Sequence, residues 1–217
     1  DAVYMTGFGT AASLLGRPDV GLLTASEMLD NLRRIVAATD LPVIADADTG
    51  YGNPINVIRT VQEYEPTGAA GLHIEDQMTP KRCGHMDGKQ VIEAGEFVAK
   101  IEAAVAARTD RDFTIIARTD ARAPLGLDAA LERARDARDA GADVLFVEAL
   151  QDEAEIELVA RELAGVPLLF NWAEGGKTPP LTLERISELG FAIVIMPIST
   201  LLAATAAMRD VLTGIRT

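Results

Sequence analysis

Short runs of valine, isoleucine, leucine and alanine recur along the chain, and each is followed by a charged amphipathic segment. The runs lack alternation between apolar and polar residues, which is typical of strands buried on both faces of a parallel sheet. We therefore predict strands at residues 2–6, 42–47, 70–74, 114–117, 144–147, 167–170 and 192–196.

Helical patterns fill the intervals between these strands. Thr24 and Glu27 have the spacing of a capping box, which predicts a helix that begins just after Thr24. Apolar residues of the segment 127–140 recur at helical spacing, with Arg and Asp on the opposite face. Glycines follow several helices, at the point where a left-handed residue ends a helix: Gly141, Gly165 and Gly190.

The order strand–helix, repeated about seven times, predicts an α/β fold with a parallel sheet, either an open doubly wound sheet or a barrel. No GxGxxG or Walker A pattern follows the first strand, which disfavours the nucleotide-binding open sheet. No low-complexity linker divides the chain, so we predict a single domain over residues 1–217. Seven units are one fewer than a (β/α)8 TIM-type barrel has, and we expect its first strand and helix to be missing upstream.

Composition narrows the class of protein. The 217 residues are 48% hydrophobic and 24% charged, which suits a globular fold with a large core. Acidic residues outnumber basic ones by 33 to 20, and the net charge of −13 argues against nucleic acid or an anionic membrane as partner. Cys83 is the single cysteine and no signal peptide is visible, so a reducing, cytoplasmic setting is the simplest interpretation.

One uncharged stretch, residues 189–208, has the length of a membrane span. Pro197, Ser199 and Thr200 interrupt it midway, and it ends the last of several similar units. We therefore expect a buried strand followed by a buried helix.

Polar residues stand at the carboxyl ends of the predicted strands, which open onto the one face of a parallel barrel where active sites form. Several carboxylates in one mouth repel each other unless a cation neutralises them. Mg²⁺, with Mn²⁺ as the alternative, prefers such oxygen ligands. The competing interpretation is that these residues cap helices and pair with nearby arginines. They are Thr6, Asp46, Asp48, Glu75, Asp76, Arg118, Asp120, Glu148 and Asn171.

The loop at residues 77–89 is too long for a routine connection and contains glycine and proline, as an active-site lid does. Its basic residues should favour the thiolate of Cys83, so that Cys83 exchanges a proton near neutral pH. A free surface cysteine is the alternative. His73 lies within an apolar strand and is expected to be a satisfied core histidine. The basic neighbours of the cysteine are Lys81, Arg82 and a protonated His85.

The chain contains four motifs, which are DADTGYG at 46–52, GLHIEDQ at 71–77, KRCGH at 81–85 and ARTD at 117–120. Together they resemble the isocitrate lyase and phosphoenolpyruvate mutase superfamily. The cysteine loop is most similar to that of 2-methylisocitrate lyase and its relatives that act on substituted malates. The resemblance implies a (β/α)8 barrel that exchanges a C-terminal helix between subunits and forms a homotetramer, a dimer of dimers. That swapped helix is expected to be missing here, so the domain is expected to be incomplete at both ends.

The resemblance also implies a set of metal-binding and substrate-binding residues. Asp46 would be the main carboxylate for Mg²⁺, while Asp48 and Glu75 would hold metal-bound waters. Asp19 matches an acidic position near those waters. Substrate contacts are implied for Thr6, Gly7, Phe8, Asp48, Gly84, Arg118, Glu148 and Asn171.

Catalytic roles follow from the same resemblance. Cys83 would be the general acid, and Tyr4 occupies a position implicated in deprotonating the substrate hydroxyl. The superfamily has Ser-Gly-Gly where this chain has Thr-Gly-Phe at residues 6–8, a departure that changes the wall of the keto-acid pocket. The full set of residues with an implied catalytic role is Cys83, Tyr4, Lys81, His85 and Arg118.

The implied activity is that of a Mg²⁺-dependent carbon–carbon lyase. Its substrate would be a 2-hydroxy di- or tricarboxylate, such as 2-methylisocitrate or a substituted malate. The products would be an α-keto acid such as pyruvate and a dicarboxylate such as succinate. The alternatives are an oxaloacetate decarboxylase or hydrolase and a carboxyphosphonoenolpyruvate or phosphoenolpyruvate phosphonomutase. A non-catalytic, metal-stabilised scaffold becomes the alternative if Phe8 closes the pocket.

Overall fold

The computed structural model describes residues 1–216 of the chain. Strands form at all seven predicted places, and hydrogen-bonded neighbours run parallel in chain order, β1 to β5 in one sheet and β6 with β7 in another. A bridge between Leu145 and Leu168 connects the two sheets. The α/β fold with parallel strands is therefore confirmed. The strands are β1 (Val3–Met5), β2 (Val43–Asp46), β3 (Gly71–Glu75), β4 (Thr114–Thr119), β5 (Val144–Val147), β6 (Leu169–Asn171) and β7 (Ile193–Ile195).

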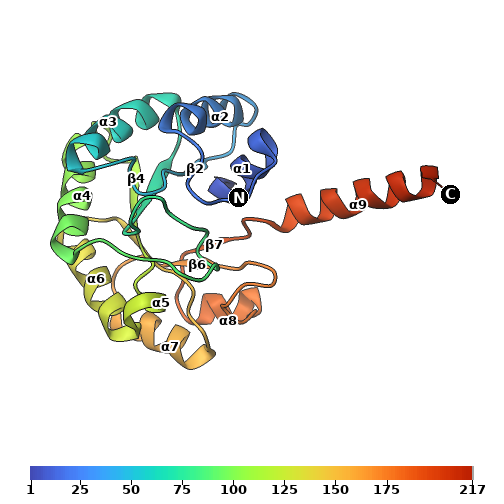
Figure 1. Cartoon of the computed structure of the whole chain (residues 1–217). Coiled ribbons are helices and arrows are strands. Elements are labelled where there is room, and N and C mark those ends of the chain that lie inside the picture. The colour runs from blue at the N-terminus through green and yellow to red at the C-terminus, as the bar shows by residue number, and fades with distance from the viewer. Residues whose placement is uncertain (217) are drawn as a thin grey trace.

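Helices follow the strands and form an outer arc around them (Figure 1). This arrangement is that of an α/β barrel, with strands inside and helices outside. The helices are α1 (Gly7–Leu15), α2 (Ala25–Ala37), α3 (Pro54–Tyr64), η1 (Glu65–Thr67), α4 (Ala94–Ala107), α5 (Arg122–Leu125), α6 (Leu127–Asp139), α7 (Glu153–Glu162), α8 (Leu183–Glu188) and α9 (Ser199–Arg216).

Local signals in the sequence set several helix boundaries. The predicted capping box begins α2: the Glu27 N–H donates to the Thr24 side chain, and the Glu27 carboxylate accepts from the Thr24 N–H at 2.8 Å. The apolar stripe of α6 is buried, as its spacing predicts. The predicted glycines have positive φ, for example 100° at Gly141, so a residue with a side chain would be strained there.

The core has an outer and an inner part. A large apolar cluster lies between strands and helices. A smaller cluster gathers apolar side chains from strands β4 to β7, with Tyr4 packed against it. Because side chains alternate between the two faces of a strand, the second cluster is formed by the opposite face from the first. This inner cluster is the apolar base beneath the carboxyl-end site: Ile116, Val144, Phe146, Leu169 and Ile195.

The uncharged stretch at residues 189–208 forms β7 and the first half of α9. The prediction of a buried helix there is wrong, because none of the α9 residues is buried and the helix extends away from the rest of the fold (Figure 1). Its apolar side chains stay in contact with water; Ile215 is 75% exposed. Within residues 1–216, no helix combines the length and apolarity needed to span a membrane.

The strand β3 approaches β4 closely at Gly71, and this generates a stability prediction. In Gly71→Ala, the new Cβ would lie 2.5 Å from the Thr114 carbonyl oxygen. Because the neighbour is backbone, we expect the free energy of unfolding to fall by about 1–3 kcal/mol. Urea titration followed by circular dichroism measures this change.

Gly95→Ala in α4 is the matched control. Its Cβ would meet no atom within 4 Å. Alanine is also the better helix former by up to about 1 kcal/mol, so this variant should be unchanged or more stable. Equal unfolding midpoints for Gly71→Ala and the unmodified chain would contradict the close approach of the two strands.

Candidate active site

A cavity of about 190 Å³ lies at the carboxyl ends of the strands, beneath the loop at residues 77–89 and beside the loop after β6. Most of the residues singled out from the sequence line this cavity. Gly7, Asp48 and Glu75 lie outside its lining but contact residues within it. The predicted residues that line it are Tyr4, Thr6, Phe8, Asp19, Asp46, Lys81, Cys83, Gly84, His85, Arg118, Glu148 and Asn171.

Asp46, at the end of β2, is held by backbone donors. Its Oδ2 accepts from the Gly7 N–H at 2.8 Å, and its Oδ1 accepts from the Asp48 N–H at 2.9 Å. Burial opposes ionisation, but His73, Lys81 and the backbone donor lower the pKa of Asp46 to about 2. The Gly7 N–H therefore supports Asp46, and the substrate contact implied for Gly7 stays a prediction. An alanine Cβ at Gly7 would lie 2.7 Å from Asp46 Oδ2, so only glycine fits.

Lys81 supplies the positive charge next to Asp19 and Asp48. Its Nζ lies 2.8 Å from Asp19 Oδ1 and 2.6 Å from Asp48 Oδ1, and its side chain is 5% exposed. Burial works against the charged form, yet Asp48, Asp46 and the other carboxylates raise the pKa of Lys81 well above its usual range. Burial raises the pKa of Asp48 to about 7 against the opposing effect of Lys81. Lys81 therefore stands between Asp19 and Asp48, two of the carboxylates that the resemblance assigned to the metal site.

A ready-made shell of carboxylates was expected, and the structure corrects this expectation. Among residues 1–216, no three His, Cys, Asp or Glu side chains are arranged to hold a metal ion. The physical reason is that the carboxylates face different cations: Asp19 and Asp48 face Lys81, whereas Glu75 faces Arg118.

The donor chemistry nevertheless fits a hard divalent cation. Both carboxylate oxygens of Glu75 are buried and accept no hydrogen bond from the described residues, and Asp48 Oδ1 has only its ion pair with Lys81. Burial raises the pKa of Glu75 well above its usual range. Buried oxygens without hydrogen-bond donors are costly, and Mg²⁺ is the kind of cation that such oxygens bind.

Arg118, at the end of β4, links three carboxylates. Its Nε lies 2.9 Å from Asp120 Oδ2 and 3.4 Å from Glu75 Oε2, and one terminal nitrogen lies 3.3 Å from Glu148 Oε2. Its guanidinium also stacks 5.1 Å above the centre of the Phe146 ring. Burial disfavours its charge, but these carboxylates raise the pKa of Arg118 well above its usual range. Arg118 is thus a fixed, permanently charged group at the cavity wall.

The loop at residues 77–89 packs onto this arginine. A Cβ at Gly84 would lie 2.5 Å from the Arg118 guanidinium and 2.6 Å from Glu148 Oε2, so the loop needs glycine there. His85 Nδ1 accepts from the Lys177 N–H at 3.1 Å, and Asn171 Nδ2 lies 3.3 Å from His85 Nε2. That nitrogen lies 3.7 Å from Glu148 Oε1. His85 therefore joins the loop to the segment after β6.

Cys83 is half-buried at the cavity, and its acidity differs from the prediction. Burial raises the pKa of the Cys83 thiol, and the backbone contact with His85 and the charge of Arg118 lower it only partly. Lys81 does not activate the thiol because it is paired with Asp19 and Asp48. The predicted thiolate is therefore wrong, and the group facing the cavity is a protonated thiol.

Tyr4, which is partly buried, and His73, which is fully buried, form a contact that the sequence did not predict. The Tyr4 hydroxyl lies 2.7 Å from His73 Nε2, and the rings stack with centroids 5.8 Å apart. Burial and the nearby Asp46 raise the pKa of Tyr4, so it keeps its proton. Burial lowers the pKa of His73 to about 4. His73 is in the core as expected, but it is not satisfied, since Nδ1 accepts or donates no hydrogen bond among the described residues.

Glu148 and Asn171 contact each other at the wall of the cavity. Asn171 Nδ2 donates to Glu148 Oε2 at 3.0 Å, and Glu148 Oε1 accepts from the Ala149 N–H at 2.7 Å. Asn171 Oδ1 accepts no hydrogen bond from the described residues, which leaves an acceptor for a ligand. The two residues are placed together as the sequence predicted.

Two carboxylates that follow strands, Asp76 and Asp120, pair with basic side chains, as the competing interpretation of the strand-end residues predicted. Asp76 pairs with Arg133 at 3.2 Å and accepts from the Asp120 N–H, and Asp120 pairs with both Arg118 and Lys89. Sequence reasoning missed Lys89, because a lysine in a polar loop carries no signal that its side chain will be fully buried.

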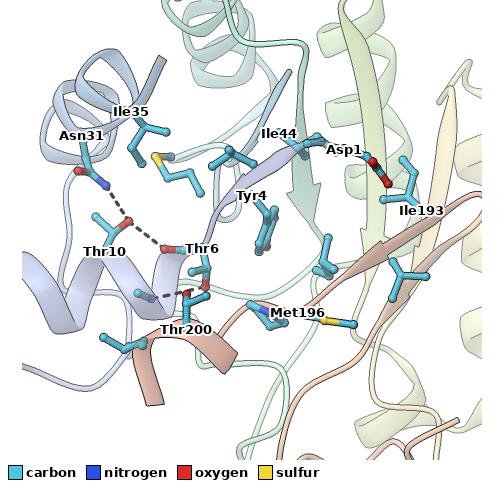
Figure 2. A pocket seen from close by; sticks show the side chains of 18 of the residues that line it. Asp1, Tyr4, Thr6, Thr10, Asn31, Ile35, Ile44, Ile193, Met196 and Thr200 are labelled. Atoms are coloured by element: carbon cyan, nitrogen blue, oxygen red, sulfur yellow. Dashed lines mark hydrogen bonds between the residues drawn. The ribbon is translucent and has the colours of Figure 1, made fainter. Parts of the chain in front are cut away.

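A second cavity, of about 1240 Å³, lies between β1 and β7 (Figure 2). Figure 2 shows Tyr4 projecting into it, near a chain in which Asn31 donates to Thr10 and Thr10 donates to the Thr6 carbonyl. Tyr4 and Thr6 line both cavities, so the wall of the site at β1 is also the wall of this opening.

The chain resembles characterised proteins along its whole length. It is 49% identical over 216 residues to a 2,3-dimethylmalate lyase of Eubacterium barkeri, covering 100% of this chain and 74% of the relative. It is 44% identical over 216 residues to a 2-methylisocitrate lyase of Salmonella typhimurium, covering 99% of this chain and 73% of the relative.

Solved structures agree with these sequence matches. A 2,3-dimethylmalate lyase, described as a PEP mutase/isocitrate lyase superfamily member, superposes with a TM-score of 0.96 at 45% identity, over 99% of this chain and 72% of that one. An oxaloacetate acetylhydrolase bound to 3,3-difluorooxalacetate also superposes with a TM-score of 0.96, at 44% identity over 99% of this chain and 74% of that one. A phosphonopyruvate hydrolase in complex with oxalate and Mg²⁺ superposes with a TM-score of 0.86, at 35% identity over 99% of this chain and 74% of that one.

A family model supplies the assignment. The model described as phosphoenolpyruvate phosphomutase matches residues 1–216. With a parallel α/β fold, a carboxyl-end cavity and relatives of this similarity, the chain belongs to the phosphoenolpyruvate phosphomutase family, within the isocitrate lyase/PEP mutase superfamily.

Proposed function

We propose that this chain is a carbon–carbon bond lyase. Its substrate is a 2-hydroxy di- or tricarboxylate of the 2,3-dimethylmalate or 2-methylisocitrate type, and its products are an α-keto acid and a second carboxylic acid. The observation that carries the proposal is the packing of Gly84 directly against Arg118 and Glu148, which brings the Cys83 thiol and a fixed cation to the same cavity. The lyases of E. barkeri and S. typhimurium support the reaction class.

Arg118 and the amino end of α1 orient the substrate. A guanidinium binds a carboxylate through planar paired hydrogen bonds, and Arg118 is buried at the cavity wall. The Phe8 N–H, in the first turn of α1, has no acceptor among the described residues and offers a second donor for a carboxylate. Asn171 Oδ1 is placed to accept from the other half of the substrate.

Tyr4 and Cys83 handle protons at the two ends of the broken bond. The Tyr4 hydroxyl lies at the cavity and 2.7 Å from His73 Nε2, so Tyr4 is proposed to take the proton of the substrate hydroxyl while its own proton passes to the neutral His73. Cys83 donates its proton to the carbanion released by bond cleavage. A raised thiol pKa suits this role, because the general acid must be protonated before the bond breaks.

The proposed cofactor is Mg²⁺, with Mn²⁺ as the alternative, held by Asp46, Asp48 and Glu75. The buried oxygens of Glu75 without hydrogen bonds support this assignment, and so does the Mg²⁺–oxalate complex of the related phosphonopyruvate hydrolase. Bound there, the cation would stabilise negative charge on a substrate oxygen by Lewis-acid action.

The exposed apolar side chains of α9 support a proposal that copies of this chain assemble through that helix. Leu202, Met208, Val211 and Leu212 are between 45% and 63% exposed, which is unusual for so many large apolar side chains on one helix. A homotetramer built by helix exchange would cover them.

An oxaloacetate-cleaving hydrolase is the second candidate, because an oxaloacetate acetylhydrolase superposes as closely as the lyase does. A substrate panel separates the two. We expect keto-acid release, measured by a coupled dehydrogenase, from 2,3-dimethylmalate or 2-methylisocitrate in the presence of Mg²⁺. Turnover of oxaloacetate alone would favour the hydrolase, and no turnover of any 2-hydroxy acid or of oxaloacetate would exclude both.

Cys83→Ser tests the general acid. The hydroxyl is a far weaker acid than the thiol, so turnover should fall by about 10²–10⁴-fold. Binding of Mg²⁺, measured by calorimetry, should be unchanged, because Cys83 is not among the proposed ligands. Met86→Leu, a change of the 39% exposed side chain in the same loop, is the control and should keep its turnover. Undiminished activity of Cys83→Ser would remove the proton-transfer role.

Asp46→Asn tests the cation site while it preserves the shape of the side chain. In the unmodified chain, Mg²⁺ at 100 times its dissociation constant should add about 2.7 kcal/mol of stability, visible as a higher melting temperature. The shift and the activity should both vanish in Asp46→Asn. Asp210→Ala, whose side chain is 76% exposed on α9, should retain the full shift. A Mg²⁺-induced shift that survives in Asp46→Asn would place the cation elsewhere.

A further inference from the structure

Lys89 ends the loop at residues 77–89 with a fully buried ammonium group. Its side chain is 0% exposed, as is that of its partner Asp120, and Lys89 Nζ lies 2.6 Å from Asp120 Oδ1. The same nitrogen donates to the carbonyl oxygen of Gly84. Burial of a lysine is costly unless its charge is paired, so this position of the side chain is held by those two contacts.

The contacts of Lys89 connect the loop to the substrate-orienting arginine. Asp120 receives Lys89 on one side and Arg118 on the other, where Nε donates at 2.9 Å. Gly84, the other partner of Lys89, packs against the Arg118 guanidinium and directly follows Cys83. One ammonium therefore fixes the backbone beside the thiol and shares the carboxylate that positions the arginine.

We propose that Lys89 is a positioning residue that latches the loop at residues 77–89 onto Asp120 and thereby sets both the Cys83 thiol and the Arg118 guanidinium. When Lys89 leaves Asp120, the Gly84 carbonyl loses its donor and Asp120 keeps Arg118 as its remaining cationic partner. The loop then opens, and the Cys83 thiol and the Arg118 guanidinium lose their positions at the same time. The expected effect of Lys89 on turnover rests on the proposed lyase function, whereas the latch itself does not.

Lys81 is a buried anchor near the other end of the loop, whereas a third lysine contact of the loop lies nearer to water. Lys177 pairs with Asp87, but the Asp87 side chain is 93% exposed. Solvent-exposed ion pairs contribute little to stability, so this pair should not hold the loop. Lys177→Met is therefore a matched control for Lys89→Met: the substitution is the same, and both lysines contact the same loop.

The single cysteine allows a direct measurement of loop position. Cys83 in the folded chain is alkylated with iodoacetamide and, in parallel, with a bulky fluorescein maleimide. Both reagents attack the thiolate, so the ratio of their rates cancels its ionised fraction and reports access alone. We expect the ratio of bulky to small reagent to rise at least tenfold in Lys89→Met, and also in Lys89→Gln. In Lys177→Met it should stay within twofold of the unmodified chain.

Turnover gives a second readout on the same variants. With a substrate from the panel above, kcat of Lys89→Met should fall at least tenfold, and Lys177→Met should be unchanged. An unchanged alkylation ratio in folded Lys89 variants would overturn the latch, and so would loss of the native circular dichroism spectrum in both, since Lys89 would then support the fold as a whole. If the unmodified chain cleaves no 2-hydroxy acid, the lyase proposal fails while the alkylation ratio still decides on the latch.

Discussion

Neutralisation of buried carboxylates at one end of the strands is the constraint on which this site depends. Moving an ionised carboxylate out of water costs several kcal/mol unless a cation and hydrogen bonds compensate, roughly as for any buried ion. Lys81 compensates Asp19 and Asp48, and Arg118 compensates Glu75 and Glu148. Two cations thus face four carboxylates, so acidic groups are in excess before any ligand arrives. A polycarboxylate substrate would add further negative charge, which is the physical reason for a divalent cation there.

The loop at residues 77–89 carries much of this compensating charge. Lys81 and Lys89 both come from it, and both are buried against carboxylates that follow strands. The loop is therefore held by electrostatics at its two ends, with Cys83 between them. This arrangement links closure of the cavity to its charge balance, because the loop cannot leave without exposing unpaired carboxylates. A lid held in this way excludes water at the same time as it supplies the proton donor.

Part of the site could be predicted from sequence because each parallel strand brings its last residues to the same edge. Asp46, Arg118, Glu148 and Asn171 were found by this rule, and they lie together at the cavity. Their ion pairs could not be predicted, because a pairing such as Lys89 with Asp120 depends on where a loop folds back. The acidity of Cys83 was mispredicted for the same reason: neighbours in sequence suggested activation, whereas burial decides it.

The sequence by itself determined the strands, several helix caps and the parallel α/β class, because these depend on local spacing of apolar residues and on hydrogen bonds between near neighbours. It also determined which residue types reach the carboxyl ends of the strands. Only the tertiary structure decided that Lys81 stands between two carboxylates, that Tyr4 meets His73, and that the apolar face of α9 is uncovered. Those outcomes depend on burial and on contacts between distant segments, which no local pattern encodes.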